Sequence, residues 1–140
     1  MQLSDAVDFA RDHRNGILIT QKSDGRPQSS NIAYTVDTED RIEISVTDGR
    51  AKTSNLRRTP TASLHINRDD FWAYAVIEAD VEFSTVATRP DDETVERLVG
   101  YYRAMVGEHD DWDEYRAAMV AEGRLLLTLT PTHAYGMLNR

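Results

Sequence analysis

The stretch RIEISVTDGRAKTSNLRRTPTASLHIN, residues 41–67, carries the pattern that decides the fold class. Apolar and polar residues alternate over 41–47 and again over 61–67, which predicts two half-buried strands. Between them, residues 51–58 predict a short helix that ends before Pro60, because proline cannot continue a helix. The chain has no GxGxxG or GxxxxGKS/T motif, which argues against Rossmann and P-loop folds. The expected inward-facing residues are Ile42, Ile44, Val46, Ala62, Leu64 and Ile66.

Short turns join the other expected strands. KSDGRP (22–27) places Asp-Gly before Pro, which favours a tight hairpin turn. Short connections favour antiparallel pairing, so the sequence predicts an α+β protein with a mainly antiparallel sheet. Further strands are expected at 16–20, 28–36, 71–84 and 124–138, the last one broken or bulged at Pro131. Helices are expected at 4–13, 89–108 and 111–123, the last two packed together outside the sheet.

The expected strand 71–84 is partly apolar on both faces. One face begins with Trp72, Tyr74 and Val76 before it becomes acidic. A small monomer cannot cover two apolar faces, so this face is either a dimer interface or a flat wall against a planar ligand. Both hold if the ligand lies at the interface. The opposite face carries Phe71, Ala73, Ala75, Ile77, Ala79, Val81 and Phe83.

The composition limits the function classes. The 140 residues suit one domain, and the absence of cysteine excludes disulfides, zinc–thiolate sites and thiol nucleophiles. No apolar run approaches the ~20 residues of a membrane span and no signal pattern opens the sequence, so we expect a cytoplasmic protein without a membrane partner. A net charge of −8 argues against a nucleic-acid partner, which needs a broad basic surface.

One segment runs against this acidity. Residues 49–68 contain no Asp or Glu but hold five cations: Arg50, Lys52, Arg57, Arg58 and Arg68. Backbone N–H groups at the start of the expected helix are unpaired and partly positive, and the hydroxyls of Thr53 and Ser54 would add donors. The segment therefore suits one small anion such as a phosphate. The alternative is solvated charge on a helix surface.

A second candidate segment is 28–31, where Gln28, Ser29, Ser30 and Asn31 are all polar and uncharged. This pattern is typical of an edge strand. It also suits a rim of amide and hydroxyl groups that hydrogen-bonds a heterocycle or its polyol chain.

Catalytic side chains and metal ligands lack a recognisable pattern. The sequence has no GxSxG or HExxH motif, and none of its four histidines stands in a triad context. The acidic stretch 108–114 is interpreted as a solvated turn between helices. We therefore assign no catalytic residue and no metal site, and expect the chemistry to come from a cofactor.

Several of these segments together resemble the split β-barrel flavin and deazaflavin oxidoreductases, the PPOX class of pyridoxamine-phosphate-oxidase-like proteins. The resemblance extends from about Gly16 to Gly136 and is closest to the branch that binds coenzyme F-420, an 8-hydroxy-5-deazaflavin. It rests on GRPQSSN (25–31), RAKTSNLRR (50–58) followed by Pro60, WAYAVIEADVE (72–82), and DDETVERLVGYYRAMVGEHDDWDEYRAAMVAEGRLLLTLTP (91–131) followed by His133, Tyr135 and Gly136.

The resemblance implies a six-stranded antiparallel split β-barrel with flanking helices, formed by one domain over residues 1–140. It also implies a homodimer with two cofactor sites between the subunits. Arg50 and Lys52 would hold the cofactor's phosphate or anionic tail. The other cofactor-binding residues implied are Gln28, Ser30, Asn31, Ile32 and Asn55, with Trp72, Tyr74 and Ala75 in the far wall and His133 approaching from the partner subunit.

The activity that the resemblance implies is an F-420-dependent reductase. A hydride would pass from the reduced deazaflavin to a small electrophilic, unsaturated organic acceptor, and solvent or Tyr74 would supply the proton. Two alternatives stay open: an FMN-dependent oxidase of the pyridoxamine 5'-phosphate type, and a protein that binds the deazaflavin without turnover.

Overall fold

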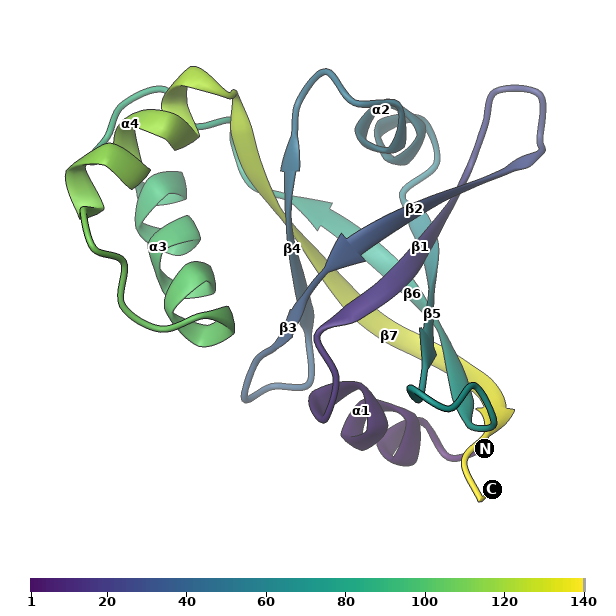
Figure 1. The fold of residues 1–140 in the computed structure, drawn as a ribbon. Helices are drawn as coiled ribbons and strands as arrows, with labels where there is room; N and C mark the ends of the chain where they lie inside the picture. Colours follow the sequence, from purple (N-terminus) through teal and green to yellow (C-terminus); the bar gives the residue numbers. More distant parts are fainter. Residues whose placement is uncertain (140) are drawn as a thin grey trace.

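A computed structural model describes residues 1–139 (Figure 1). Its helices are α1 (Leu3–Arg11), α2 (Ala51–Arg58), α3 (Glu93–Met105) and α4 (Trp112–Ala121). Its strands are β1 (Asn15–Gln21), β2 (Pro27–Ala33), β3 (Thr35–Val36), β4 (Ile42–Thr47), β5 (Thr61–Asn67), β6 (Tyr74–Phe83) and β7 (Arg124–Met137). The helix at 51–58 and the strand at 61–67 were predicted with these same bounds.

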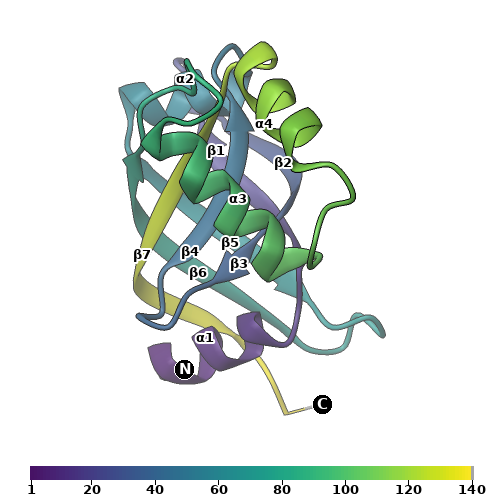
Figure 2. The ribbon, with the colours of Figure 1, turned by 90° about the vertical axis from the view of Figure 1, so that its left-hand side faces the viewer.

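The strands form one antiparallel sheet in the order β2-β1-β5-β6-β7-β4-β3. The hairpin between β1 and β2 turns at 22–26, where the N–H of Lys22 donates to the carbonyl of Arg26 (2.8 Å). The sheet curls so that its edge strand β2 returns towards β4 (Figures 1 and 2). This confirms the predicted α+β split barrel, with six longer strands and the two-residue β3 added at one edge.

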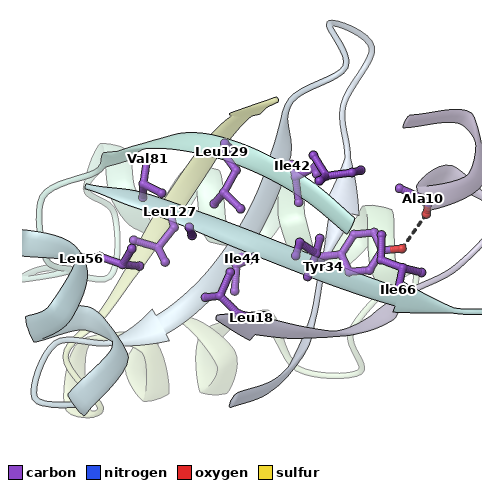
Figure 3. Close-up of a cluster of buried hydrophobic side chains, with 14 of the residues drawn as sticks. Ala10, Leu18, Tyr34, Ile42, Ile44, Leu56, Ile66, Val81, Leu127 and Leu129 are labelled. Atoms are coloured by element: carbon purple, nitrogen blue, oxygen red, sulfur yellow. Dashed lines mark hydrogen bonds between the residues drawn. The ribbon is translucent and has the colours of Figure 1, made fainter. Parts of the chain in front are cut away.

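Aliphatic side chains from alternate strand positions fill the barrel. The predicted inward residues of β4 and β5 are all buried, as period-two alternation requires. Tyr34, between β2 and β3, is also fully buried, and its hydroxyl donates to the carbonyl of Ala10 (2.7 Å), which ties α1 to the barrel (Figure 3). Leu56 brings α2 into the same core. Each such large aliphatic side chain contributes roughly 1.5–3 kcal/mol.

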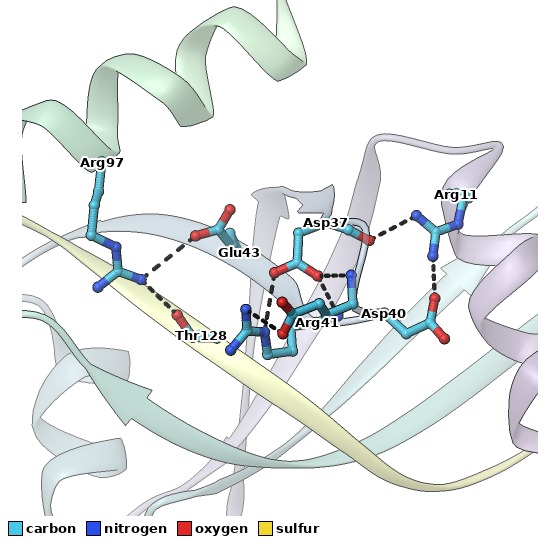
Figure 4. Close-up of polar contacts among 8 residues, drawn as sticks. Arg11, Asp37, Asp40, Arg41, Glu43, Arg97 and Thr128 are labelled. Atoms are coloured by element: carbon cyan, nitrogen blue, oxygen red, sulfur yellow. Dashed lines mark hydrogen bonds and ion pairs between the residues drawn. The ribbon is translucent and has the colours of Figure 1, made fainter.

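Helices α3 and α4 pack on each other outside the barrel, as predicted (Figure 1). Polar contacts attach α3 to the outer face of the sheet. Arg97 donates to the hydroxyl of Thr128 (3.1 Å) and pairs with Glu43 (3.6 Å), as Figure 4 shows. Burial raises the pKa of Glu43, although Arg97 opposes that shift. The apolar contacts between the two helices come from Val95, Leu98, Val99, Tyr101, Tyr115 and Met119.

The predicted start of the long strand at residue 71 was wrong. β6 begins at Tyr74, and residues 68–73 form a tight loop. Phe71 has a φ of 71° and is 77% exposed, although the alternation had placed it in the core. The cause is local: Asp70 accepts from the backbone N–H of Trp72 (3.0 Å) and pairs with Arg68 (2.8 Å), which closes the chain before pairing with β5 begins.

Strand β7 carries the predicted irregularity near Pro131. Glu78 pairs with His133 whereas Ala79 pairs with Pro131, so one extra residue bulges from β7. Further along, Gly136 has a φ of 148°, and a Cβ atom there would lie 2.3 Å from the carbonyl oxygen of Tyr74. Only glycine therefore permits this approach of β7 to β6. No helix within residues 1–139 has the length and apolarity to span a bilayer.

Candidate functional site

A cavity of about 560 Å³ lies where the edge strand β2 faces β4. We call it the edge cavity. One side is formed by β2, the opposite side by the end of β4 and the start of α2, and α3 and α4 cover it. Its lining residues are Asn31, Ile32, Ala33, Ser45, Val46, Thr47, Arg50, Lys52, Tyr101, Tyr102, Met105, Tyr115, Met119 and Arg124.

The edge cavity is positively charged in an acidic protein. Its lining contains Arg50, Lys52 and Arg124 but no Asp or Glu, while the whole chain has a net charge of −8. Burial lowers the pKa of Lys52, and the neighbouring charges of Arg50 and Arg124 lower it further. Arg124 pairs with Glu122 (2.9 Å), but Arg50 and Lys52 have no described carboxylate partner and repel one another in a partly buried space. An anion bound among them would remove that cost.

The first turn of α2 borders this cavity with its backbone N–H groups. Arg50 is the N-cap residue, no side chain caps the helix, and the first turn has no acid. A helix start in this state favours an anion through its N–H groups and its dipole. One expected donor does not contribute: Thr53 is fully buried, and its hydroxyl donates to the carbonyl of Thr47 (2.9 Å). That contact orders the bend between β4 and α2 instead.

The other three cations of the acid-free segment have partners elsewhere. Arg57 pairs with Asp48 (2.8 Å) and lies over the ring of Phe83 (4.9 Å). Arg58 donates to the side chain of Asn55 (2.9 Å), and Arg68 pairs with Asp70. Within residues 1–139, no carboxylate pairs with Arg50 or Lys52. The structure thus separates two cations that face the cavity from three that support the fold.

Of the residues expected along β2, Asn31 and Ile32 line the edge cavity. The carbonyl of Ala33 points away from β1, because it accepts from the hydroxyl of Tyr101 on α3 (3.0 Å). Strand geometry then directs the backbone N–H and C=O of Asn31 to this same free edge. Ser30, at the neighbouring position opposite Leu18, is half-buried and outside the lining.

Gln28 and Asn55 contact each other instead of the cavity. The Nδ2 of Asn55 donates to Oε1 of Gln28 (2.8 Å) and to the hydroxyl of Thr20 (3.1 Å). Its Oδ1 accepts from Arg58, so the amide of this buried residue is satisfied on both sides. These bonds fasten α2 to β1 and β2 and thereby fix the position of the helix start.

Trp72, Tyr74, Ala75 and His133 lie outside the edge cavity. Trp72 is in the 68–73 loop and is 70% exposed, and His133 is exposed on β7. Tyr74 lies beside His65, with ring centroids 5.3 Å apart. The side chain of Ala75 is in the barrel core, so only its backbone is available to a ligand.

The sequence reasoning missed the wall supplied by α3, α4 and β7. The helices at 89–108 and 111–123 were predicted only to pack on each other, because apolar spacing alone does not distinguish a packed stripe from a cavity wall. Tyr101 and Tyr115 donate to the carbonyls of Ala33 (3.0 Å) and Leu98 (2.9 Å), and burial raises the pKa of each to about 12. The sequence did hold one clue to this wall: two adjacent helices carry three tyrosines, Tyr101, Tyr102 and Tyr115.

Comparison with known proteins supports the architecture. The protein family described as pyridoxamine 5'-phosphate oxidase matches residues 4–138. A solved structure of a conserved hypothetical protein from Mycobacterium tuberculosis superposes with a TM-score of 0.76 at 20% identity, covering 100% of this chain and 86% of that one.

Two further solved structures have the same fold. An F-420 reductase gives a TM-score of 0.65 at 20% identity, covering 87% of this chain and 89% of its own. A putative pyridoxamine 5'-phosphate oxidase from Listeria innocua gives 0.67 at 15% identity, covering 99% and 98%. At these identities the likeness concerns the fold and not the ligand.

Proposed function

Because the chain belongs to the pyridoxamine 5'-phosphate oxidase family, we propose that it is an oxidoreductase that uses coenzyme F-420 to reduce a small electrophilic, unsaturated organic acceptor. The observation that carries this proposal is the edge cavity, which joins Arg50 and Lys52 to the uncapped start of α2 without a carboxylate in its lining. The choice of F-420 over FMN is part of this proposal and rests on the resemblance of the sequence to the deazaflavin branch, since solved neighbours of the same fold include both an F-420 reductase and an FMN-binding protein.

The donor set of the edge cavity fits such a cofactor. Arg50, Lys52 and the α2 N–H groups would hold its phosphate and anionic tail. The backbone edge at Asn31 would hydrogen-bond the ring system, and Tyr102 on the opposite side would cover it. When bound, a reduced deazaflavin supplies a hydride. The residues of this chain bind it, orient it and exclude water.

We further propose that residues 1–140 form one split-barrel domain and that two copies form a homodimer. The support is an exposed apolar surface that includes Phe71, Trp72, Tyr135 and Met137, together with the absence of Trp72, Tyr74 and His133 from the lining of the edge cavity in their own chain. An interface of about 2,000 Å² in total is expected. Light scattering at micromolar protein concentration measures the mass, and a monomer mass contradicts this part of the proposal.

The cofactor is tested by titrating the purified chain with F-420 and, separately, with FMN, following the absorbance of each ligand. We expect F-420 to bind more tightly than FMN, and both affinities to fall as salt rises. Tighter binding of FMN, with peroxide formed on turnover, would favour the FMN-dependent oxidase instead. Tight F-420 binding without reduction of any unsaturated acceptor would identify a carrier.

A further inference from the structure

Four aromatic rings lie behind one wall of the edge cavity, where α3 gives way to α4. We call them the aromatic cluster: Tyr102, His109, Trp112 and Tyr115. The centroids of every pair among these rings are 5.0–5.7 Å apart. Tyr102 and Tyr115 also line the edge cavity. His109 belongs to the turn 106–111 between the end of α3 and the start of α4 (Figure 2), so the cluster connects this turn to the cavity wall.

We propose that His109 makes the edge cavity sensitive to pH. As a neutral ring it keeps Tyr102 in the cavity wall, and its protonation loosens the turn 106–111 and weakens the binding of a ring that lies against Tyr102. The change in the wall needs no ligand, whereas its effect on binding rests on the proposed function. His109 is a positioning residue, because it acts through Tyr102 and is not itself part of the cavity lining.

The hydrogen bonding of His109 requires a neutral ring. Its Nδ1 lies 2.9 Å from the backbone nitrogen of Asp111, and a backbone N–H can only donate. Nδ1 is therefore the acceptor, and the ring hydrogen is on Nε2. Histidine is the side chain whose charge ordinarily changes between about pH 5 and 8. A proton added to Nδ1 would point at the N–H of Asp111, so the charged ring and this bond exclude each other.

The bond between Asp111 and His109 joins the turn to α4. Asp111 is the N-cap residue of that helix, and its carboxylate accepts from the N–H of Glu114 (3.1 Å). Towards α3 the turn contains Gly107, which has a φ of 107°, and a Cβ atom there would meet nothing within 4 Å apart from adjoining residues. The turn can therefore move without displacing a packed part of the protein once the bond to His109 is lost.

The charges around His109 disfavour an imidazolium inside the aromatic cluster. Arg103 already lies over the ring of Trp112 (4.7 Å), and a second cation beside that ring would be repelled. Glu108 is already engaged, since its carboxylate accepts from Arg103 (3.1 Å) and from Nε1 of Trp112 (3.0 Å). The exposed acids of the turn would instead draw a charged ring outwards. The ionisable groups near His109 that the structure describes are Tyr102, Arg103, Glu108, Asp110, Asp111, Glu114 and Tyr115.

Tyr102 depends on the aromatic cluster for its place in the wall. Its ring packs edge-on against those of Trp112 and His109, with interplanar angles of 81° and 60°. Tyr115 is fixed independently, because its hydroxyl donates to the carbonyl of Leu98 (2.9 Å). Loss of His109 from the cluster therefore affects Tyr102 first. One aromatic contact changes an equilibrium constant by up to about tenfold, which sets the size of the expected effect on binding.

The cavity wall is tested without a ligand. Met105 lines the edge cavity and Met1 does not, so their methyl NMR signals report on the wall and on a remote site. Between about pH 8 and about 5.5 we expect the signal of Met105 to shift with the same midpoint as the ring signals of His109, and that of Met1 not to follow it. Trp112, the one tryptophan left in Trp72→Phe, should change its emission at that midpoint. A midpoint that matches another histidine instead overturns the proposal.

The variant His109→Asn keeps the turn but removes its titration. Its side-chain oxygen can accept from the N–H of Asp111, and an amide gains no proton in this pH range. We expect the pH responses of Met105 and Trp112 to vanish in this variant. The matched control His133→Asn, at an exposed position on β7 outside the edge cavity, should respond as wild type does. Responses that persist in His109→Asn, or that are absent from wild type, show the proposal to be wrong.

Binding of F-420 tests whether the change reaches the site. From about pH 7.5 to about pH 5.5 the dissociation constant should rise about tenfold in wild type and less than about twofold in His109→Asn. An equal fall of affinity in both proteins, or none in wild type, overturns the proposal. If Met105 and Trp112 respond as expected but neither F-420 nor FMN binds at either pH, the proposed function fails and the pH-sensitive wall stands.

Discussion

The N-terminal ends of α2 and α3 are built in opposite ways. α3 follows Asp92, whose carboxylate accepts from the N–H of Val95 (2.8 Å), and its first turn adds Glu93 and Glu96. α2 follows Arg50, with no capping side chain and no acid. Both ends carry the same partial positive charge. In α3 the chain neutralises it, whereas in α2 no described side chain does so, which is the charge that the proposed anionic ligand would supply.

The open start of α2 has an energetic consequence. A missing cap forgoes about 1 kcal/mol, and two cations in the same place disfavour the helix further. The helix is held by other contacts: Leu56 in the barrel core, and the amide of Asn55 bonded to Thr20, Gln28 and Arg58. A short helix fastened in its middle can thus keep its first turn available for binding.

Converting α2 to the α3 pattern should have the largest effect. Arg50→Asp removes a cation, introduces a repelling charge and supplies the missing cap. We expect the dissociation constant for F-420 to rise at least about a hundredfold, since more than one charge-assisted contact is lost. Stability should hold or rise by about 0.5–1 kcal/mol because of the new cap. Isothermal titration and thermal unfolding measure the two; unchanged affinity would show that α2 does not bind the anion.

Lys52→Ala comes next and removes one contact without adding a charge. The loss of about 1.5–3 kcal/mol corresponds to a ten- to hundredfold weaker binding of F-420, with a shallower dependence on salt. The fold should survive because no residue of the described chain pairs with Lys52. Lys22→Ala, which changes the other lysine at the exposed hairpin turn, is the control. Equal affinity in wild type and Lys52→Ala would leave Lys52 as solvated surface charge.

At the capped end, Asp92→Ala should lower stability by about 1 kcal/mol and leave cofactor affinity unchanged. Burial opposes ionisation of Asp92, but backbone N–H groups of Thr88, Val95 and Arg89 outweigh it and lower the pKa to about 2. A lowered pKa means that this contribution is present above about pH 4 and is lost as the pH falls towards 2. Urea unfolding at pH 7 and pH 2.5 tests this, since the difference in stability between wild type and variant should be clearly smaller at pH 2.5 than at pH 7.

The smallest effect is expected at the other end of α2. Arg57 pairs with Asp48 at the surface and lies over Phe83. Removing it in Arg57→Ala should cost at most about 1 kcal/mol of stability. Affinity for F-420 should change less than twofold, because Arg57 does not line the edge cavity. A tenfold loss of affinity would show that the cation-rich segment acts as a whole and would remove the distinction between its two ends.

The sheet was predictable from the sequence, and part of the site was not. Apolar and polar residues alternate over 41–47 and 61–67 because one face of each strand is buried and the other is not. This pattern predicted both strands, and β4 and β5 confirm them. Phe71 broke the same rule, because the side chain of Asp70 redirects the backbone through contacts that alternation does not encode. The tyrosines of α3 and α4 were not predicted to line a cavity. The spacing of apolar residues along a helix indicates that one face is buried, but not what that face contacts.

The sequence by itself determined the antiparallel sheet, the helix at 51–58 and the concentration of five cations within 49–68, because these depend on local propensity and on composition. Only the tertiary structure decided which cations are available. Arg57 and Arg58 meet partners from other parts of the chain, whereas Arg50 and Lys52 face a cavity without acids. The reason is physical: charge is a property of a residue, but whether that charge is compensated depends on neighbours that folding brings from distant positions.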